Sequence, residues 1–442
     1  MIPAELLRRL DVPAPRYTSY PTVPAWSERF GAADHADALR RTGYGARPIS
    51  VYVHLPFCKE LCSYCGCNVV ITRDQRRVER YLDSLEREIA LAASLLGPRR
   101  VVERLHLGGG TPTFLDERQL LRLWRALGAF AIARNAEVAL EIDPVVTRKE
   151  QLALLAGFGF NRLSMGVQDF DPEVQRAVNR IQSVEETAAA IDYARKVGFS
   201  SINLDLIYGL PRQTAERFGA TMDRVVELAP DRVAVFSFAF LPEQRPNQRR
   251  LQLAELPSGG TKDALLALAT SKLEAAGFRT IGIDHFARSG DELARAADAG
   301  TLWRDFQGYT PRRFDTTVAF GATGISDFGF AYAQNVRPLG EYGAAIAAGE
   351  LPTAKGLWLD EDDQRRRAII TDLMCNGRAD LGDADAFAGE LAALAPLAGD
   401  GLVAIAGARL QLSALGRRFA RNVAMVFDRY LRAGAQAFSR TV

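Results

Sequence analysis

The stretch YVHLPFCKELCSYCGCNVVITR, residues 52–73, holds four of the five cysteines of the chain. They are Cys58, Cys62, Cys65 and Cys67, and they form the pattern CxxxCxxCxC directly after a short apolar run. The N-terminal segment lacks the continuous apolar core of a signal peptide, so we expect a cytoplasmic protein whose thiols stay reduced. The cysteine cluster therefore predicts metal binding or catalysis rather than a disulfide framework.

The composition argues against several classes of partner. The chain has 442 residues, 48% hydrophobic and 24% charged, which is typical of a globular protein with one large and one smaller domain. Its 55 basic and 53 acidic residues give a net charge of +2, so neither a nucleic-acid nor a membrane partner is expected. No apolar run is long enough to span a bilayer.

Short apolar or β-branched runs alternate with helical patterns along most of the chain. The predicted strands are Ile49–Leu55, Val102–Gly108, Glu137–Asp143, Arg162–Gln168, Ser201–Gly209 and Arg232–Phe238. The predicted helices are Arg77–Leu96, Glu117–Ala133, Lys149–Gly157, Val184–Lys196, Thr214–Leu228 and Lys262–Ala276. This alternation predicts βαβ units and a parallel sheet, and the number of units favours an α/β partial barrel.

Polar and glycine residues follow the predicted strands at the point where each one ends. The cysteines follow the first strand, and GGGTPT follows the second. Glu141 and Asp143 end the third strand, Gln168 ends the fourth, and Asp205 lies midway along the fifth. Because the carboxyl ends of parallel strands carry the chemistry of such folds, we expect a functional site there.

The pattern changes after about residue 340. Helices are expected over Asp360–Cys375, Asp383–Leu394 and Ser413–Gly434, with a hairpin in GLVAIAGARLQLSALG. The sequence therefore predicts an N-terminal arm over residues 1–45, a catalytic barrel over 46–340 and a mostly helical C-terminal domain over 341–442.

The cysteine spacing favours an iron–sulfur cluster over zinc. A zinc site usually pairs two distant cysteine knuckles, whereas the only other cysteine here is Cys375. Iron–sulfur clusters often take several thiolates from one short loop, and three thiolates leave one iron of a four-iron cluster open to a ligand. Zinc with a distant histidine and buried structural cysteines are the alternatives.

Longer motifs identify the chain as resembling a known family. These motifs are PRYTSYPT, YVHLPFCKELCSYCGCN, HLGGGTPTFL, EIDP, NRLSMGVQDF, VQRAVNR, NLDLIYGLP, DHFAR, DFQGYT and FDRYLRAGAQAFSR. Together they resemble the motifs of the oxygen-independent coproporphyrinogen III oxidases of the radical S-adenosylmethionine (SAM) superfamily. The resemblance runs from Arg16 to the C-terminus. It implies a partial (β/α)6 TIM-like radical SAM barrel with an N-terminal arm and a mostly helical C-terminal domain.

The resemblance also implies a set of site residues. Cys58, Cys62 and Cys65 would bind a 4Fe–4S cluster, whose open iron binds SAM, while Cys67 would act in turnover without being a ligand. Tyr52 and His54 are candidate catalytic residues, and a buried, hydrogen-bonded histidine and ordinary strand packing are the alternatives for them. The candidate cofactor-binding residues, for what is expected to be two SAM molecules, are Tyr52, Tyr64, Gly109, Gly110, Thr111, Glu141, Gln168, Arg180, Asp205, Ala239 and Ile325.

The implied reaction is oxidative decarboxylation of two propionate side chains of a porphyrinogen to vinyl groups. A flavodoxin- or ferredoxin-type protein is the expected electron donor, and a monomer is the expected state. The arm bearing Arg16, Tyr17 and Tyr20 is interpreted as a lid or as a packing strap.

Three other functions stay open. Phe240 stands where the family has histidine, and segments 243–250 and 314–324 also differ, which favours a related radical SAM enzyme acting on another tetrapyrrole. A haem chaperone of the same superfamily is a further alternative, although Cys67 and the PRYTSYPT arm argue against it. A non-catalytic haem- or cluster-binding carrier is the third.

Overall fold

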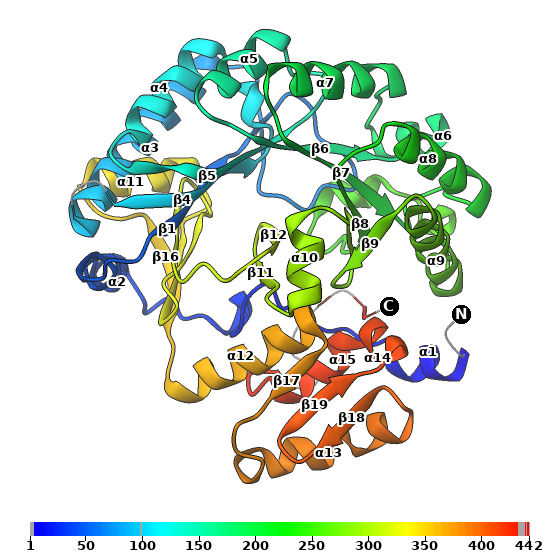
Figure 1. Ribbon diagram of the computed structural model, residues 1–442. Helices are drawn as coiled ribbons and strands as arrows, with labels where there is room; N and C mark the ends of the chain where they lie inside the picture. Colours follow the sequence, from blue (N-terminus) through cyan, green and yellow to red (C-terminus); the bar gives the residue numbers. More distant parts are fainter. Residues whose placement is uncertain (1–3, 98–99, 432–437, 439, 442) are drawn as a thin grey trace. The chain divides into compact units, whose positions relative to one another are not determined.

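The computed structural model describes residues 4–97, 100–431, 438 and 440–441, and divides into two compact units (Figure 1). We call Ser27–Asp205 with Phe314–Trp358 the sheet unit. We call Met1–Trp26, Leu206–Arg313 and Leu359–Val442 the terminal unit. These two units do not test the predicted division into an N-terminal arm, a catalytic barrel and a C-terminal domain, which stays a prediction.

Parallel strands form the centre of the sheet unit. Strands β1 (Ile49–Leu55), β4 (Val101–Gly109), β5 (Ala131–Ile142) and β6 (Arg162–Gln168) pair in that order, with Tyr52 beside His106 and His106 beside Ala139. On the other edge, β13 (Thr317–Phe320) runs parallel to β1. The antiparallel strands β14 (Ile325–Asp327), β15 (Ala331–Asn335) and β16 (Thr353–Trp358) then extend the sheet.

Amphipathic helices cover one face of these strands (Figure 1). They are α2 (Ala32–Tyr44), α3 (Gln75–Leu96), α4 (Glu117–Leu127), α5 (Lys149–Gly157), α6 (Pro172–Val178), α7 (Val184–Val197) and α11 (Leu339–Ala347). In α3 the side chain of Asp74 caps the first turn, and Val78, Leu82, Leu85 and Ile89 are buried at helical spacing.

The strands therefore present a polar face on their other side. Leu163, Met165 and Val167 of β6 are buried, whereas the alternate residues, among them Ser164 and Gln168, are only partly buried. Strand β7 (Ser201–Tyr208) repeats the pattern. Alternation thus places the candidate polar residues of neighbouring strands on one face.

The terminal unit combines antiparallel strand pairs with helices. Strand β8 (Arg232–Ser237) pairs with β10 (His285–Arg288), which pairs with β9 (Phe278–Ile281). The remaining strands are β11 (Trp303–Asp305) with β12 (Gly308–Thr310), and β17 (Arg378–Asp380), β19 (Arg409–Leu412) and β18 (Val403–Ala406) in that order. The helices are α1 (Ala4–Leu10), α8 (Ala215–Glu227), α9 (Gly259–Ala275), α10 (Glu292–Ala299), α12 (Glu361–Asn376), α13 (Ala388–Gly399), α14 (Ala414–Arg418) and α15 (Ala420–Ala424).

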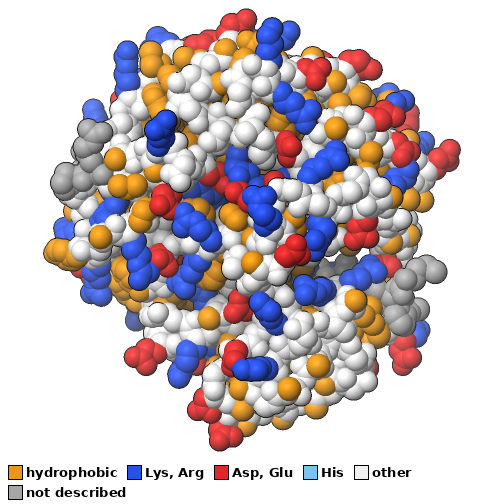
Figure 2. All heavy atoms as spheres, viewed as in Figure 1, with side chains coloured by type: hydrophobic (Ala, Val, Ile, Leu, Met, Phe, Trp, Pro, Cys, Tyr) orange, Lys and Arg blue, Asp and Glu red, His pale blue; other side chains and the backbone are white. Residues whose placement is uncertain are grey.

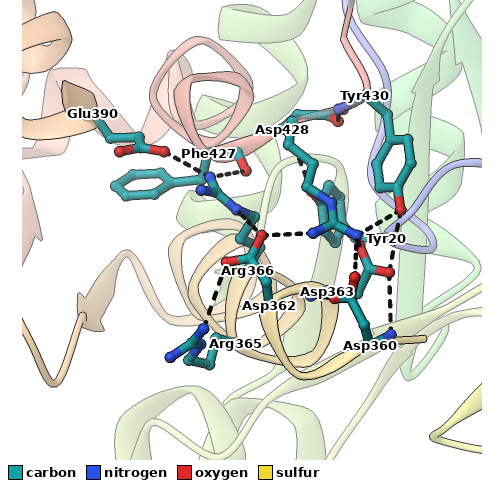
Figure 3. Close-up of polar contacts among 11 residues, drawn as sticks. Tyr20, Asp360, Asp362, Asp363, Arg365, Arg366, Glu390, Phe427, Asp428 and Tyr430 are labelled. Carbon is teal, nitrogen blue, oxygen red and sulfur yellow. Dashed lines mark hydrogen bonds and ion pairs between the residues drawn. The ribbon is translucent and has the colours of Figure 1, made fainter. Parts of the chain in front are cut away.

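The N-terminal arm is anchored within the terminal unit. Tyr17 and Tyr20 are 4% and 1% exposed, and the Tyr17 hydroxyl donates to Asp428 over 3.1 Å. Figure 3 shows Tyr20 next to Tyr430 and the acidic residues of α12, and Tyr430 donates to Asp363 over 3.2 Å. These contacts describe a packing strap in this conformation.

The six predicted strands are all present, and the predicted α/β fold with parallel strands is confirmed. Three helix predictions were wrong in extent. The helix expected over Asp383–Leu394 begins at Ala388, after a 3-10 turn over Asp385–Phe387, and continues to Gly399. The helix expected over Glu117–Ala133 ends at Leu127, since Ala131 already pairs with β4. The helix expected over Ser413–Gly434 is broken at Phe419 into α14 and α15, and residues 432–434 lie outside the described residues.

The surface matches the balanced charge of the sequence. On the face shown in Figure 2, Lys and Arg side chains are interspersed with Asp and Glu side chains. No helix in the described part of the chain combines the length and apolarity needed to cross a bilayer.

Candidate active site

The cysteine loop leaves the end of β1 and is held by backbone hydrogen bonds on both sides. Strand β2 (Phe57–Cys58) pairs with β3 (Val70–Ile71), and the Cys65 amide donates to the Cys62 carbonyl over 3.2 Å. The Ser63 amide donates to Val178 at the end of α6 over 2.9 Å. These backbone hydrogen bonds fix the conformation of the loop that carries the thiols.

The four thiols of this loop interact with one another. Burial, followed by the Cys65 and Cys62 thiols, raises the pKa of Cys58 to about 11. A hydrogen bond with the Cys65 thiol raises the pKa of Cys67 well above its ordinary value. All cysteines are free thiols, and Cys67 is exposed as a residue.

This donor set fits an iron–sulfur cluster. In the described part of the chain, no group of three or more His, Cys, Asp or Glu side chains is placed to hold a single metal ion. A cluster binds each thiolate through a different iron, so its ligands do not have to meet at one point. Three cysteines on one short loop, Cys58, Cys62 and Cys65, can therefore bind a cluster without converging on a single point.

The glycine turn after β4 packs tightly against the start of the cysteine loop. The Gly110 amide donates to Leu55 over 2.8 Å and the Thr111 amide donates to Phe57 over 2.9 Å. A Cβ atom on Gly110 would lie 2.7 Å from the Phe57 carbonyl oxygen, so only glycine fits there. The Thr111 hydroxyl lies 3.6 Å from the Cys58 sulfur.

Glu141 stands at the centre of the polar face. It accepts from the Gly109 amide over 3.1 Å and from His106 over 3.2 Å, and its side chain is 40% exposed. Burial alone would raise its pKa, but the hydrogen bond and charge of His106 and the Gly109 amide outweigh it and lower the pKa. Glu141 is therefore an open carboxylate that can accept from an ammonium or a hydroxyl group.

Tyr52 and His54 form a hydrogen-bonded pair on β1. The His54 Nε2 atom lies 2.9 Å from the Asn68 carbonyl oxygen, so Nε2 carries the proton and donates. The Nδ1 atom then accepts from the Tyr52 hydroxyl over 3.1 Å. Burial lowers the pKa of His54, which favours this neutral form.

Arg180 reaches the cysteine loop from the segment after α6. It forms an ion pair with Asp143 over 2.7 Å and donates to the Gly166 carbonyl over 2.8 Å. The Arg180 charge lowers the pKa of Cys62, although burial raises that pKa overall. Tyr64 donates to Cys62 as well. The side chains of Arg180 and Asp143 are only 14% and 17% exposed, so this ion pair is largely buried.

The remaining candidates fall in two places. Gln168 ends β6 with a left-handed φ of 68°, and Asp205 accepts from Ser164 over 2.8 Å and from Asn203 over 2.7 Å. Ile325 begins β14 in the same sheet unit. Ala239 follows β8 in the terminal unit. Apart from Ala239, the structure thus places every candidate residue in the sheet unit.

Three contacts of this site were missed by the sequence interpretation. They are His106 on Glu141, Asp143 on Arg180, and the Asn68 carbonyl on His54. The signal for His106 was available, since it alternates with Gly108 and shares a face with it. The other two contacts join segments that are distant in sequence.

Comparisons with known proteins agree with this geometry. Residues 52–225 match the family model described as the radical SAM superfamily. The oxygen-independent coproporphyrinogen III oxidase of Pseudomonas aeruginosa is 43% identical over 99% of this chain and 98% of that protein. The Escherichia coli enzyme of the same name is 45% identical over 99% and 98%.

A solved structure leads to the same family. The coproporphyrinogen III oxidase (HemN) from Escherichia coli, described as a radical SAM enzyme, superimposes with a TM-score of 0.91 at 45% identity, over 94% of this chain and 97% of that one. The chain belongs to the oxygen-independent coproporphyrinogen III oxidases, a family of radical SAM enzymes.

Proposed function

We propose that this protein converts coproporphyrinogen III into protoporphyrinogen IX by oxidative decarboxylation of two propionate side chains. The observation that carries the proposal is the cysteine loop, in which Cys58 interacts electrostatically with Cys62 and Cys65 and lies beside Thr111 of the glycine turn. The near full-length similarity to oxidases of that name supports the choice of substrate.

The thiols of Cys58, Cys62 and Cys65 would hold the 4Fe–4S cluster. When bound, the cluster would supply the one-electron chemistry that activates SAM for hydrogen-atom removal from the substrate. Gly109 and Gly110 have no side chains and so let SAM approach the backbone, Thr111 offers a hydroxyl beside Cys58, and Glu141 offers an acceptor for the SAM ammonium group. These groups orient SAM and exclude water from it.

The remaining candidates would complete the binding of SAM and substrate. The further residues proposed to contact SAM are Tyr52, Tyr64, Gln168, Arg180, Asp205, Ala239 and Ile325. His54, whose Nδ1 atom accepts from the Tyr52 hydroxyl, is proposed to contact the substrate. Cys67 is not proposed as a ligand, because the resemblance to the family implies three ligands, Cys58, Cys62 and Cys65.

The overall step needs one SAM molecule, which provides the acceptor of the hydrogen atom, and one electron acceptor for each propionate. One hydrogen atom leaves the propionate carbon attached to the ring, the carboxylate leaves as CO2, and one electron passes to an acceptor. A vinyl group remains, and the event occurs twice. We infer that a low-potential flavodoxin- or ferredoxin-type protein reduces the cluster and that the protein acts as a monomer.

An anaerobic assay separates this function from its alternatives. Protein reconstituted with iron and sulfide is given SAM and dithionite, and 5′-deoxyadenosine is measured. Coproporphyrinogen III is then added, and two molecules of CO2 per porphyrinogen are expected. A carrier would give no 5′-deoxyadenosine, and an enzyme for another tetrapyrrole would give 5′-deoxyadenosine without CO2.

A further inference from the structure

Two cationic side chains meet at the carboxyl end of β8 in the terminal unit. The Arg16 guanidinium, from the N-terminal arm, donates to the Ser237 carbonyl over 3.1 Å. The Lys262 ammonium, from the first turn of α9, donates to the Phe238 carbonyl over 3.0 Å. Two segments far apart in sequence thus bring positive charges to consecutive carbonyl groups, directly before Ala239.

The Lys262 ammonium is only partly satisfied there. It has three N–H groups, and among the described residues it has one hydrogen-bond acceptor and no carboxylate within ion-pair distance. Its Nζ atom lies 5.8 Å from the ring centre of Tyr208. Burial, followed by the charges of Arg16 and Arg421, lowers the pKa of Lys262 to about 8. An ammonium held next to other cations favours an anionic partner.

Neighbouring carboxylates are engaged elsewhere. Asp284 contacts His285 over 2.7 Å, Arg304 over 3.4 Å and Arg16 over 3.7 Å. Asp11, the acidic group that acts on Lys262, forms an ion pair with Arg440 over 2.6 Å.

The other nearby charges are engaged in the same way. Asp263, next to Lys262 in the chain, pairs with Arg418. Arg421 donates to the carbonyls of Ala14, Pro15 and Arg440. Lys262 thus has one carbonyl acceptor and no ion pair among the described residues, whereas Arg421 has three carbonyl acceptors.

The backbone makes room for the Lys262 stem. Gly209 follows β7 with a left-handed φ of +88°, and a Cβ atom there would lie 2.8 Å from Cε of Lys262. The side chain passes over Gly209 and ends at the carbonyl of Phe238. Residue 262 is half-buried, so part of it is exposed to solvent.

We propose that Lys262, with Arg16, forms a carboxylate-binding subsite at the end of β8 that holds a propionate group of the substrate. A carboxylate would accept from the free N–H groups of Lys262 and neutralise the local positive charge, which makes such bonds strong. The inference rests on the proposed function for the identity of the ligand. The methionine carboxylate of SAM has the same chemistry and is the other possible source.

The first test compares Lys262→Met with wild-type protein, with Lys262→Arg, and with Lys272→Met as a matched control. Lys272 lies on the same helix and pairs with Asp223 near the surface. Binding of coproporphyrin III and of its tetramethyl ester is measured by fluorescence on the reconstituted protein. Lys262→Met is expected to bind coproporphyrin III about tenfold more weakly, and Lys262→Arg within about threefold of wild type.

The ester and the Lys272→Met variant test whether the loss of binding depends on the carboxylate charge and on Lys262 itself. The ester lacks negative charge, so Lys262→Met should not change its affinity, and Lys272→Met should change neither ligand. Thermal melting and the cluster absorbance verify that each variant is folded and loaded. Equal binding of coproporphyrin III by wild type and Lys262→Met would overturn the inference. A rise in the KM for SAM instead would assign the carboxylate to SAM and overturn the propionate assignment.

A second test does not depend on the porphyrin. Reductive methylation of lysines is followed by mass spectrometry in sodium propionate and in sodium chloride of equal ionic strength. Propionate should slow the labelling of Lys262 at least twofold relative to Lys272. If wild-type protein neither binds nor converts the porphyrin, the proposed function is wrong. The labelling of Lys262 in propionate then tests the carboxylate subsite by itself. Equal labelling in both salts would then overturn it.

Discussion

Replacing Glu88 by glutamine should change how the stability of the protein depends on pH. Glu88 lies on α3, is 1% exposed, and accepts from the Gly321 amide over 2.7 Å, the Tyr342 hydroxyl over 2.6 Å and Asn335 over 2.6 Å. Burial, only partly opposed by these donors, raises the pKa of Glu88 from 4.5 to about 7. That difference corresponds to about 3 kcal/mol.

The sign follows from proton linkage. Below pH 4.5 the carboxyl group is neutral in the folded and the unfolded chain. Between pH 4.5 and 7 the unfolded chain loses its proton first, so unfolding becomes more favourable as the pH rises. Above pH 7 the effect is complete. Glutamine does not titrate, so the stability of Glu88→Gln does not fall with pH through this group.

The assay is urea unfolding of wild type and Glu88→Gln under anaerobic conditions at pH 5 and pH 8. The free energy of unfolding of wild type, relative to the variant, should fall by about 2.5 kcal/mol between these values, while other titrating groups cancel. Tyr342→Phe keeps the carboxyl group but removes a donor, and should enlarge the loss. A difference that stays constant with pH would refute the reasoning.

Three further predictions concern the active site. Cys62→Ala should lose the cluster absorbance and all SAM cleavage, and retained cleavage would contradict its role as a ligand. Cys67→Ser should keep the cluster but slow turnover at least tenfold, whereas loss of iron from that variant would make Cys67 a ligand. Gly110→Ala should raise the KM for SAM at least tenfold, because its Cβ atom would collide with the Phe57 carbonyl, while Gly31→Ala, where nothing lies within 4 Å of the Cβ position, is the matched control.

Local pattern was enough to place the strands that carry the site. The apolar alternation of β1 and β6 predicted their bounds, and the cysteine spacing indicated the loop that follows β1. What the pattern could not supply was partners from distant segments. The ion pair of Arg180 with Asp143 spans 37 residues, and the antiparallel strands after β13 depend on pairing rather than on local propensity.

Glu88 shows where a sequence signal existed but could not be completed. It falls on the same helical stripe as Leu85, Ile89 and Ala92, all of which are buried. A carboxylate on a buried stripe has to find donors, so the pattern indicates a buried polar network there. The donors come from a turn, a strand and a helix more than 230 residues later. Burial of a charge can therefore be predicted from periodicity, whereas the groups that satisfy it are set by the folded topology, and the same reasoning holds for Lys262, whose partner we place in the substrate.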